Sequence, residues 1–477
     1  MYTKIESITD TCVNKEITLC GWVVTVRFSK KIIFIKLADS WRSRIQPFQI
    51  IYDIKAGETD ELLKLTTGDS ISITGNIVKS PKVEQPYELV GKSFKIFGKV
   101  FEPASYPMAK TELSLEHFRS IPHLECFSAT KAAVYGVRSL LIDAIELFFK
   151  KEYFTKVDMP LITFSECEGG CQPMQATLLL TSGKINDIST DLSNNQQIDF
   201  SKDFFGVKAS LTVSSQLELE TQLPLGPVWT ITRAIRGEPS MTKRHLCEFS
   251  MIELEVPFIE SAKDIMTLSE NLIQFCLSYV LHDEWGIKAI TLLEKKTERP
   301  LKELLMGYLT KPFEIIKHRD AVTLLRQKAS QGEIQFITLP EYTEDLGSEH
   351  EKYLTDIYFK HPAIVINYPK QVKAFYMPTI ETIEGIDYVD CFDILVPGVG
   401  ELVGGSARIN DAIILENRIK ELGLDIKPLQ FYVDLRKNGS VPHGGMGMGF
   451  ERIVMFVTGV DTVRDAVAYP RFYKSGK

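Results

Sequence analysis

The sequence predicts an α+β protein in which a small all-β segment precedes a larger segment of mixed helices and strands. Three observations support this prediction. Residues 1–102 hold five short runs rich in β-branched and aromatic residues, separated by turn residues. Residues 131–152 repeat apolar side chains at helical spacing. Residues 228–256 contain two alternating apolar and polar runs around a charged loop, which is typical of an antiparallel strand pair.

Composition and charge narrow the class of protein. The chain has 477 residues, 44% of them hydrophobic and 25% charged, which is ordinary for a globular protein of several domains. The net charge of −7 argues against a general polyanion binder, although a local basic patch could still fit one RNA. We find no apolar run near the roughly 18 residues of a membrane span and no signal-peptide core at the N-terminus.

The cysteines indicate a reducing compartment. All 8 are scattered along the chain, and Cys167 and Cys171 form a CxxxC pair without a second pair downstream. Free thiols are therefore favoured over a zinc site. We expect a cytoplasmic protein that contacts neither membrane nor DNA.

The first segment predicts a small Greek-key barrel of the OB type. Its strands are ITLCGWVVTVRF, KIIFIKLAD, PFQIIYDI, DSISITGNIV and YELVGKSFKIFGKV. Such barrels bind single-stranded nucleic acid by stacking bases on aromatic rings and following phosphates with Lys and Arg. The candidate contacts are Arg27, Phe34, Gln49 and Glu88. From the residues alone, Phe34 could equally belong to the barrel core, with Arg27 on a solvated edge.

The next elements connect the barrel to the larger segment. Residues 103–130 carry prolines and are interpreted as a hinge, and residues 131–152 predict a long amphipathic helix. The run YFTKVDMPLIT predicts a strand, and Pro160 inside it favours an edge or an end. Residues 180–203 are polar and predict a mobile insertion. Residues 262–360 alternate helical patterns with loops and suggest no particular chemistry.

The strand pair of 228–256 carries more charge than its fold requires. The runs VWTITRAI and CEFSMIELEV flank the loop GEPSMTKRH, and we expect alternation to bring Arg236, Glu238, Glu248 and Glu253 to one face. Buried unpaired charge is costly. A charged ligand is therefore expected on that face.

Two later segments predict ligand contacts. Residues 445–464 place glycines immediately before a helix, which would let the backbone approach a ligand and present a helix N-terminus to an anion. Asp393 and Glu401 lie around a Pro-Gly turn. Carboxylates are the side chains that Mg²⁺ prefers, so these two residues are candidate metal ligands.

Together these segments resemble the class II aminoacyl-tRNA synthetases, in the subgroup for aspartate, asparagine and lysine. Residues 131–163 resemble motif 1, residues 228–256 motif 2 and residues 445–464 motif 3. The matching runs are Arg236-Gly237-Glu238, Arg244-His245-Leu246-Cys247-Glu248-Phe249 and Phe450-Glu451-Arg452. Gly237 stands where the family usually has alanine. The resemblance covers essentially the whole chain.

The resemblance implies a domain organisation. An OB-fold anticodon-binding domain is expected over 1–102, a hinge over 103–130 and a class II catalytic domain, an antiparallel sheet flanked by helices, over 131–477. Motif 1 implies a homodimer, against the alternative of a surface helix in a monomer. The residues that resemble the family's anticodon contacts are Arg27, Phe34, Gln49 and Glu88. In the hinge, His123-Leu124-Glu125-Cys126 lacks the family's basic residues, so no contact is assigned there.

The implied reaction forms an aminoacyl-adenylate from ATP and then transfers the acyl group to tRNA. It needs alignment and charge stabilisation rather than a protein nucleophile. Arg236 and Arg452 are the implied catalytic residues, with Arg236 on the α-phosphate and the substrate carboxylate. Phe249 and Arg452 would sandwich adenine, while Glu238 meets adenine or the tRNA end. His245 would lie near the terminal phosphates.

The implied metal is Mg²⁺, held by Glu401 with Asp393 as a second ligand. For the amino acid, residues 212–220 resemble the segment that lines the pocket, and Leu219 stands where aspartyl enzymes carry lysine. A neutral carboxamide fits better than a carboxylate there, because Arg408 can donate to its oxygen and Glu220 can accept from its nitrogen. The expected contacts with the rest of the amino acid are Glu168, Ser214, Gln216 and Glu253. Cys171-Gln172-Pro173 departs from the family pattern.

The sequence therefore predicts ATP-dependent ligation of L-asparagine to tRNA-Asn by a cytoplasmic homodimer. Three alternatives remain. An aspartyl enzyme that also charges tRNA-Asn is disfavoured by Leu219. An ammonia-dependent asparagine synthetase on the same catalytic fold would not need the barrel, and a non-catalytic RNA-binding relative would tend to lose Arg236 and Arg452.

Overall fold

The computed structural model describes residues 2–54, 62–81, 85–108, 113–165, 173–179, 190–191 and 197–476. The chain divides into two compact units. The first comprises residues 1–140 and 280–302, and the second comprises residues 141–279 and 303–477. This grouping assigns the start of the long predicted helix to the first unit.

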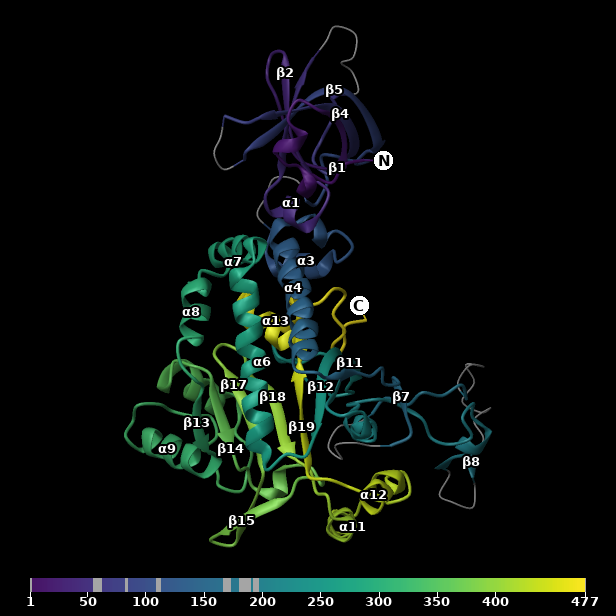
Figure 1. Cartoon of the computed structure of the whole chain (residues 1–477), viewed down its shortest axis with the longest axis vertical. Helices are drawn as coiled ribbons and strands as arrows, with labels where there is room; N and C mark the ends of the chain where they lie inside the picture. The colour runs from purple at the N-terminus through teal and green to yellow at the C-terminus, as the bar shows by residue number, and fades with distance from the viewer. Residues whose placement is uncertain are drawn as a thin grey trace. The chain divides into compact units, whose positions relative to one another are not determined.

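The first unit contains the predicted five-stranded barrel. Its strands are β1 (Glu16–Phe28), β2 (Ile32–Ala38), β3 (Phe48–Asp53), β4 (Ser70–Lys79) and β5 (Tyr87–Gly98). They close in the order β1-β2-β3-β5-β4, the purple sheet of Figure 1. Alternate residues of each strand point inward, and the fully buried Leu19, Ile33, Ile50, Ile73 and Leu89 belong to the barrel core.

Among the described residues of the first unit, four α-helices accompany the barrel. They are α1 (Trp41–Ile45), α3 (Leu115–Ser120), the start of α4 (Ala129–Lys151) and α7 (Glu284–Thr297). Trp41 on α1 meets Trp285 on α7 edge to face, with ring centroids 6.4 Å apart. Helix α4 covers the helix predicted over 131–152.

The second unit is organised around an eight-stranded sheet in the order β13-β14-β17-β18-β19-β12-β11-β6 (Figure 1). The strands are β13 (Glu314–Lys317), β14 (Ala363–Ile366), β17 (Cys391–Val396), β18 (Gly400–Ala407), β19 (His443–Gly449), β12 (Glu248–Pro257), β11 (Val228–Ile235) and β6 (Thr155–Lys156). The six strands from β14 to β11 are mutually antiparallel, and the pairs at the two edges are parallel. The predicted α+β fold is therefore confirmed.

The strand predicted in YFTKVDMPLIT is interrupted. Only β6 and β7 (Ile162–Thr163) form, and Pro160 lies between them. Strand β6 ends at Lys156, before Pro160 is reached, and the proline itself has no N–H to give to a ladder. Strand β6 forms the edge of the large sheet, as the proline indicated.

The motif 3 glycines belong to strand β19 (His443–Gly449). Helix α13 (Phe450–Thr458) begins directly after the strand. A Cβ on Gly445 would lie 2.1 Å from the carbonyl oxygen of Leu254, and one on Gly444 would lie 2.7 Å from that of Ser406. These two glycines are required for close strand packing in the middle of the sheet, which the sequence did not indicate.

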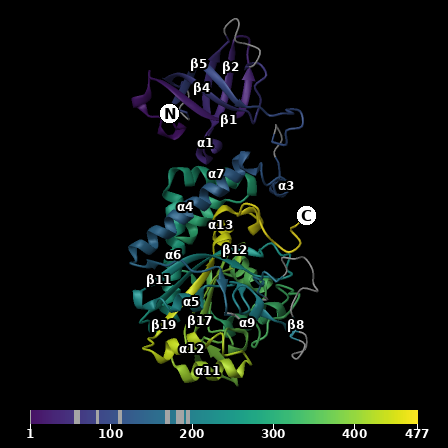
Figure 2. The ribbon, with the colours of Figure 1, turned by 90° about the vertical axis from the view of Figure 1, so that its right-hand side faces the viewer.

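The remaining helices of the larger part of the chain surround the sheet. They are α5 (Gln216–Glu220), α6 (Ala262–His282), α8 (Leu301–Tyr308), α9 (His318–Ser330), α10 (Ser348–Lys352), α11 (Ala412–Glu421) and α12 (Gln430–Lys437). A π-helical turn over Tyr353–Tyr358 follows α10. Helices α11 and α12 lie side by side in Figure 2 and share an apolar core that includes Leu415 and Tyr432.

Three smaller pairs of strands complete the fold. They are β10 (Ser210–Leu211) with β7, β15 (Thr379–Ile383) with β16 (Ile386–Val389), and β8 (Thr190–Asp191) with β9 (Gln197–Ile198). Of the insertion predicted at 180–203, residues 180–189 and 192–196 lie outside the described residues. No helix in the described part of the chain is long and apolar enough to cross a membrane.

Candidate active site

Two adjoining cavities open on the antiparallel sheet of the larger unit. Both are open clefts lined by charged and polar side chains with a few apolar ones, the kind of lining that orients a polar ligand. Four residues line both cavities: Arg236, Met251, Glu401 and Gly447. A ligand in one cavity can therefore meet a ligand in the other beside Arg236.

Arg236 is positioned by the antiparallel pair. Its backbone N–H donates to the carbonyl of Cys247 at 2.8 Å, one residue beyond the end of β11. Its guanidinium lies 5.4 Å from the ring centroid of Phe249 on β12. Both side chains line the first cavity.

Regular alternation along β12 separates the predicted carboxylates. Phe249, Met251 and Glu253 share the cavity face. Glu248 stands at an odd spacing from Glu253 and points away, 3.9 Å from the Nε of Arg233. The expectation that Glu248 joins the charged face was therefore wrong, because residues an odd number apart on a strand lie on opposite faces.

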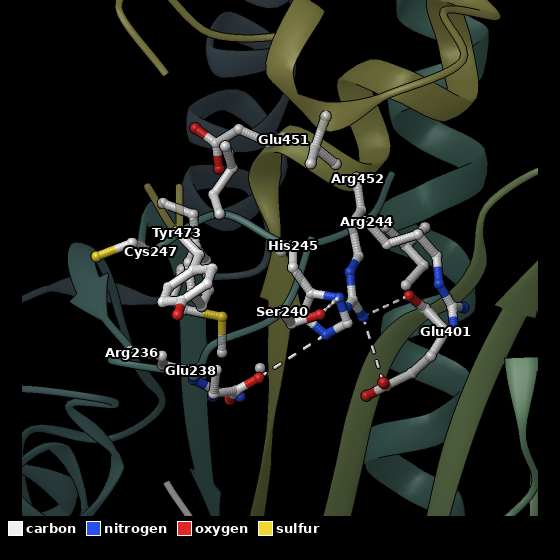
Figure 3. A pocket seen from close by; sticks show the side chains of 17 residues that line it. Arg236, Glu238, Ser240, Arg244, His245, Cys247, Glu401, Glu451, Arg452 and Tyr473 are labelled. Atoms are coloured by element: carbon white, nitrogen blue, oxygen red, sulfur yellow. Dashed lines mark hydrogen bonds and ion pairs between the residues drawn. The ribbon is translucent and has the colours of Figure 1, made fainter. Parts of the chain in front are cut away.

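The hairpin loop brings Glu238 and His245 together. The Nε2 of His245 lies 3.9 Å from a carboxylate oxygen of Glu238, and its Nδ1 shares a hydrogen bond of 3.2 Å with the hydroxyl of Ser240 (Figure 3). Burial, together with the positive charge of Arg452, lowers the pKa of His245. The imidazole is therefore neutral at pH 7 and provides one donor and one acceptor.

Arg244 ties the same loop to a segment in which the sequence indicated no chemistry. Its guanidinium donates to the carboxylate of Glu351 at 2.5 Å and to the carbonyl of Val399 at 3.0 Å. It also donates to the hydroxyl of Ser348. Gly400 has a φ of +91°, and a Cβ there would lie 2.0 Å from the Arg244 guanidinium. Arg244 and Glu351 are more than a hundred residues apart in the sequence, so no local sequence pattern indicated Glu351.

Arg452, at the start of α13, faces Glu401 on β18. Its Nη1 donates to the Glu401 carbonyl at 2.7 Å and to the Glu401 carboxylate at 3.2 Å (Figure 3). Burial works to raise the pKa of Glu401, but the charges of Arg452 and Lys373 outweigh it and hold that pKa below its usual value. Glu401 is therefore ionised at neutral pH.

The second cavity contains an ion pair that the sequence did not indicate. The Nζ of Lys373 donates to Asp393 on β17 at 2.6 Å, and both side chains line the cavity. Burial raises the pKa of Asp393 to about 7, against the opposing charge of Lys373. Asp393 and Glu401 each have a carboxylate oxygen 3.4 Å from the position a Cβ on Gly404 would take, so the two carboxylates flank one glycine.

Two oxygen-bearing side chains so placed fit Mg²⁺. This ion is usually held by one or two carboxylates, with substrate phosphates and water as its other ligands. No group of three or more His, Cys, Asp or Glu side chains among the described residues could hold a metal by itself. Two carboxylates are too few for a closed structural metal site. They suit an ion that binds together with a phosphate ligand.

Arg408 lines the second cavity and forms ion pairs with two buried carboxylates. Its Nη2 donates to Glu255 on β12 at 2.6 Å, and its Nε lies 3.5 Å from Glu220. The guanidinium also lies 4.9 Å from the ring centroid of Tyr376. The Arg408 side chain is thus buried and fixed in orientation.

Glu220 occupies a different position from the one the sequence suggested. Its side chain is fully buried and accepts hydrogen bonds from Arg436 at 2.6 Å, Tyr432 at 2.8 Å and Gln216 at 3.1 Å. Its other near partner is the Nε2 of His443, at 2.9 Å. Burial works to raise the pKa of Glu220, but Arg436 and His443 outweigh it and lower that pKa. The Glu220 carboxylate therefore makes its hydrogen bonds to these protein groups rather than to a ligand.

Leu219 also lies in the interior, where it packs with Leu223 and Val228 rather than lining either cavity. Ser214, Gln216 and Glu253 do line the second cavity. Glu253 accepts from the Ser214 hydroxyl and from the backbone N–H of Ser215. The predicted Glu168 lies outside the described residues, as do Cys167 and Cys171.

The barrel residues divide into two settings. Arg27 on β1 pairs directly with Phe34 on β2, and Gln49 on β3 pairs with Lys36, so these four side chains share the outer face of the barrel. Phe34 is 37% exposed, which removes it from the barrel core. Glu88 is only 7% exposed and accepts a hydrogen bond of 2.6 Å from Ser80. Lys36 is the member of this face that the sequence reasoning did not name.

The second unit thus presents two adjoining cavities lined by charged side chains on a largely antiparallel sheet. Residues 119–473 match the family model for class II tRNA synthetases of the D, K and N type. The chain belongs to this family.

Several asparagine–tRNA ligases are similar to this chain over its full length. That of Borreliella burgdorferi is 38% identical over 482 residues, which cover 100% of this chain and 99% of the relative. That of Clostridium kluyveri is 37% identical and covers 97% and 96%. The crystal structure of asparaginyl-tRNA synthetase from Pyrococcus horikoshii complexed with asparaginyl-adenylate has a TM-score of 0.82, 29% sequence identity, and coverage of 99% and 98%.

Proposed function

We propose that this protein ligates L-asparagine to tRNA-Asn in two steps, through an asparaginyl-adenylate and with release of AMP and pyrophosphate. The full-length similarity to asparagine–tRNA ligases supports this function. The geometric observation that carries it is the charge balance of the second cavity. Lys373 is paired with Asp393, and Arg408 is paired with Glu255.

This balance favours an amide over an acid in the substrate side chain. A carboxylate substrate would need a cation that is not already neutralised, and each of these two cations has a carboxylate within 2.6 Å. Desolvating an uncompensated charge in such a site is costly. A carboxamide needs only a donor for its oxygen and an acceptor for its nitrogen. Arg408 supplies the donor in this proposal.

Arg236 joins the two substrates. It lines both cavities, so one guanidinium can contact the α-phosphate of ATP and the carboxylate of the amino acid together. A planar guanidinium suits either group through paired hydrogen bonds. The carboxylate attacks the α-phosphorus, and pyrophosphate leaves. Arg236 lowers the barrier by offsetting the negative charge that builds up on the phosphoryl oxygens.

The first cavity holds the nucleotide in this proposal. Phe249 and Arg452 bind adenine between them, by stacking and by cation–π contact. Glu238 contacts adenine or the tRNA end, and His245 lies near the terminal phosphates. Ser214, Gln216, Glu253 and Glu168 contact the amino acid around its α-amino group.

Glu401 and Asp393 are the proposed Mg²⁺ ligands. When bound, the ion neutralises phosphate charge. Arg452 holds the Glu401 carboxylate at 3.2 Å and Lys373 holds Asp393 at 2.6 Å. Each cation therefore keeps its carboxylate in place and compensates its charge until the nucleotide arrives.

The tRNA contacts belong to the barrel in this proposal. Residues 1–102 form the anticodon-binding domain, residues 103–130 the hinge and residues 131–477 the catalytic domain. Arg27, Phe34, Gln49 and Glu88 contact the anticodon, with Phe34 stacking on a base. The enzyme acts as a cytoplasmic homodimer with motif 1 at the subunit interface.

Amino-acid-dependent ATP–pyrophosphate exchange tests the proposal, with asparagine and aspartate assayed in parallel. We expect exchange with asparagine alone. Exchange with aspartate would keep the chemistry and overturn the specificity, and exchange with neither would overturn the enzymatic function.

The Arg236→Ala variant serves as the chemical control. We expect exchange to fall by roughly 10²–10³-fold, because a preorganised charge on the reacting phosphate is lost. The melting temperature should remain that of the wild type. Near-wild-type exchange in this variant would contradict the role given to Arg236.

A further inference from the structure

The C-terminal segment 470–476 contributes Tyr473 to the lining of the first cavity and is anchored to the motif 2 hairpin. Arg471 forms an isolated β-bridge with Glu248, and its carbonyl accepts the backbone N–H of Cys247 at 2.7 Å. Through these contacts, the C-terminal segment pairs with the start of the second strand of the hairpin. The tail is therefore held beside the residues that position Arg236 and Phe249.

A second set of contacts fixes the next residue of the tail. The guanidinium of Arg464 lies 4.1 Å from the ring centroid of Phe472 and donates to the carbonyl of Met241 at 3.0 Å. The backbone N–H groups of Phe472 and Ser475 each take part in a local hydrogen bond, so the chain turns sharply here. Lys474, inside the turn, has a φ of +61°, a conformation that L residues rarely adopt.

This turn directs Tyr473 into the cavity. Tyr473 lines the cavity together with Cys247, Phe249 and Arg452, although it lies beyond the end of motif 3 at residue 464. Figure 3 shows its side chain next to that of Cys247, across the cavity from Arg452 and Glu401. Tyr473 is 39% exposed, so its ring is not buried in a core and can contact a ligand.

We propose that Tyr473 is a nucleotide-binding residue whose ring covers the adenosine part of ATP, with the tail acting as a fixed strap. The inference rests on the proposed function, because it takes the first cavity as the nucleotide site. An aromatic ring at this place adds a contact surface for a purine. Its hydroxyl can also donate to or accept from the base or the ribose.

The test compares Tyr473→Leu and Tyr473→Phe in asparagine-dependent ATP–pyrophosphate exchange. We expect Tyr473→Leu to raise the KM for ATP about tenfold, as loss of one base–aromatic contact does, with the KM for asparagine within about twofold of wild type. Tyr473→Phe, which keeps the ring, should stay within about threefold. The control Tyr358→Leu removes an exposed tyrosine of the same unit that lines neither cavity and should change neither constant.

Two results would overturn the role of Tyr473. One is a KM for ATP that stays within twofold of wild type in Tyr473→Leu. The other is an equal rise in both KM values with a lower melting temperature, which would make the tail merely structural. Calorimetric titration with ATP and Mg²⁺ alone separates this inference from the proposed function. If the wild type binds ATP but exchanges no pyrophosphate, the titration still tests Tyr473.

Discussion

Asp393 and Lys373 illustrate how one buried contact sets the behaviour of a candidate metal ligand. Burial disfavours the charged carboxylate and raises the pKa of Asp393 to about 7, while Lys373 at 2.6 Å limits that rise. A carboxylate with such a pKa changes charge close to neutral pH. Its affinity for a cation should therefore depend on pH in the same range.

We expect the free Mg²⁺ concentration for half-maximal exchange to rise about tenfold per pH unit below pH 7, because a proton then competes with the ion for Asp393. The measurement is a Mg²⁺ titration of exchange between pH 6 and pH 8. In the control Asp393→Asn, the requirement should be high and nearly independent of pH. A wild-type requirement that stays constant from pH 8 to pH 6 would exclude Asp393 as a ligand.

Glu220 is a second buried carboxylate, but one whose partners stabilise its charge. Arg436 and His443 lower its pKa, so its contribution to the free energy of unfolding is present above the unfolded pKa of about 4.3 and is lost only as pH falls further. Removing it leaves Arg436 buried and without its counter-ion. Such losses cost roughly 3–5 kcal/mol.

Glu220→Gln should accordingly lower the midpoint of urea unfolding at pH 7, measured by near-UV circular dichroism. The deficit should persist down to about pH 4 and narrow at lower pH. Glu218→Gln, on the same short helix but half-buried, is the matched control and should lose less than about 1 kcal/mol. Equal losses in the two variants would mean that the buried network contributes little.

Strand β19 shows how close packing against neighbouring strands can require glycine at particular positions. It lies between β18 and β12, and at Gly444 and Gly445 a side chain would meet the backbone carbonyls of those neighbours. The constraint differs along the strand. A Cβ on Gly445 would meet a rigid backbone carbonyl at 2.1 Å, whereas one on Gly447 would meet the flexible end of Met251 at 2.7 Å.

We therefore expect Gly445→Ala to destabilise the protein by about 3 kcal/mol or more, because the adjoining strands must separate. Gly447→Ala should cost less, since the Met251 side chain can move. Calorimetric melting of both variants tests the difference. A Gly447→Ala variant as unstable as Gly445→Ala would show that strand spacing, rather than the identity of the nearest atom, controls the cost.

The division of the chain into two units separates the chemistry from the proposed recognition of the anticodon. Both cavities are built entirely from the second unit, and the barrel belongs to the first. The exposed Phe34 is paired with Arg27 on the outer face of the barrel, where a base could stack. Adenylate formation should therefore be independent of this face.

Phe34→Ala should leave exchange unchanged while reducing kcat/KM for tRNA charging about tenfold, as expected for loss of one stacked base. The control Phe97→Ala removes another exposed aromatic of the barrel strands and should affect neither assay. Comparable loss of exchange and charging in Phe34→Ala would mean that Phe34 supports the fold instead of the RNA.

Much of the fold follows from local sequence patterns. Strand alternation and helical spacing extend over neighbouring residues, so they predicted the barrel, the long helix α4 and the β11–β12 pair. The resemblance to motifs 2 and 3, rather than a local pattern, implied that Arg236, Phe249 and Arg452 serve one site, and all three line the first cavity. Strand alternation and helical spacing are local patterns. Such patterns are visible in the sequence because each is set by contacts within one element or between adjacent ones.

Contacts between remote segments could not be read in this way. Four such contacts join side chains that are separated in the chain. They are the pairing of Arg244 with Glu351, the neutralisation of Lys373 by Asp393, the burial of Glu220 among Arg436 and His443, and the position of Tyr473 in the lining of the first cavity. Their geometry depends on how the sheet and its connections pack. Sequence patterns thus supplied the elements and the reactive residue types, while packing decided which charges are neutralised and which remain open to a ligand.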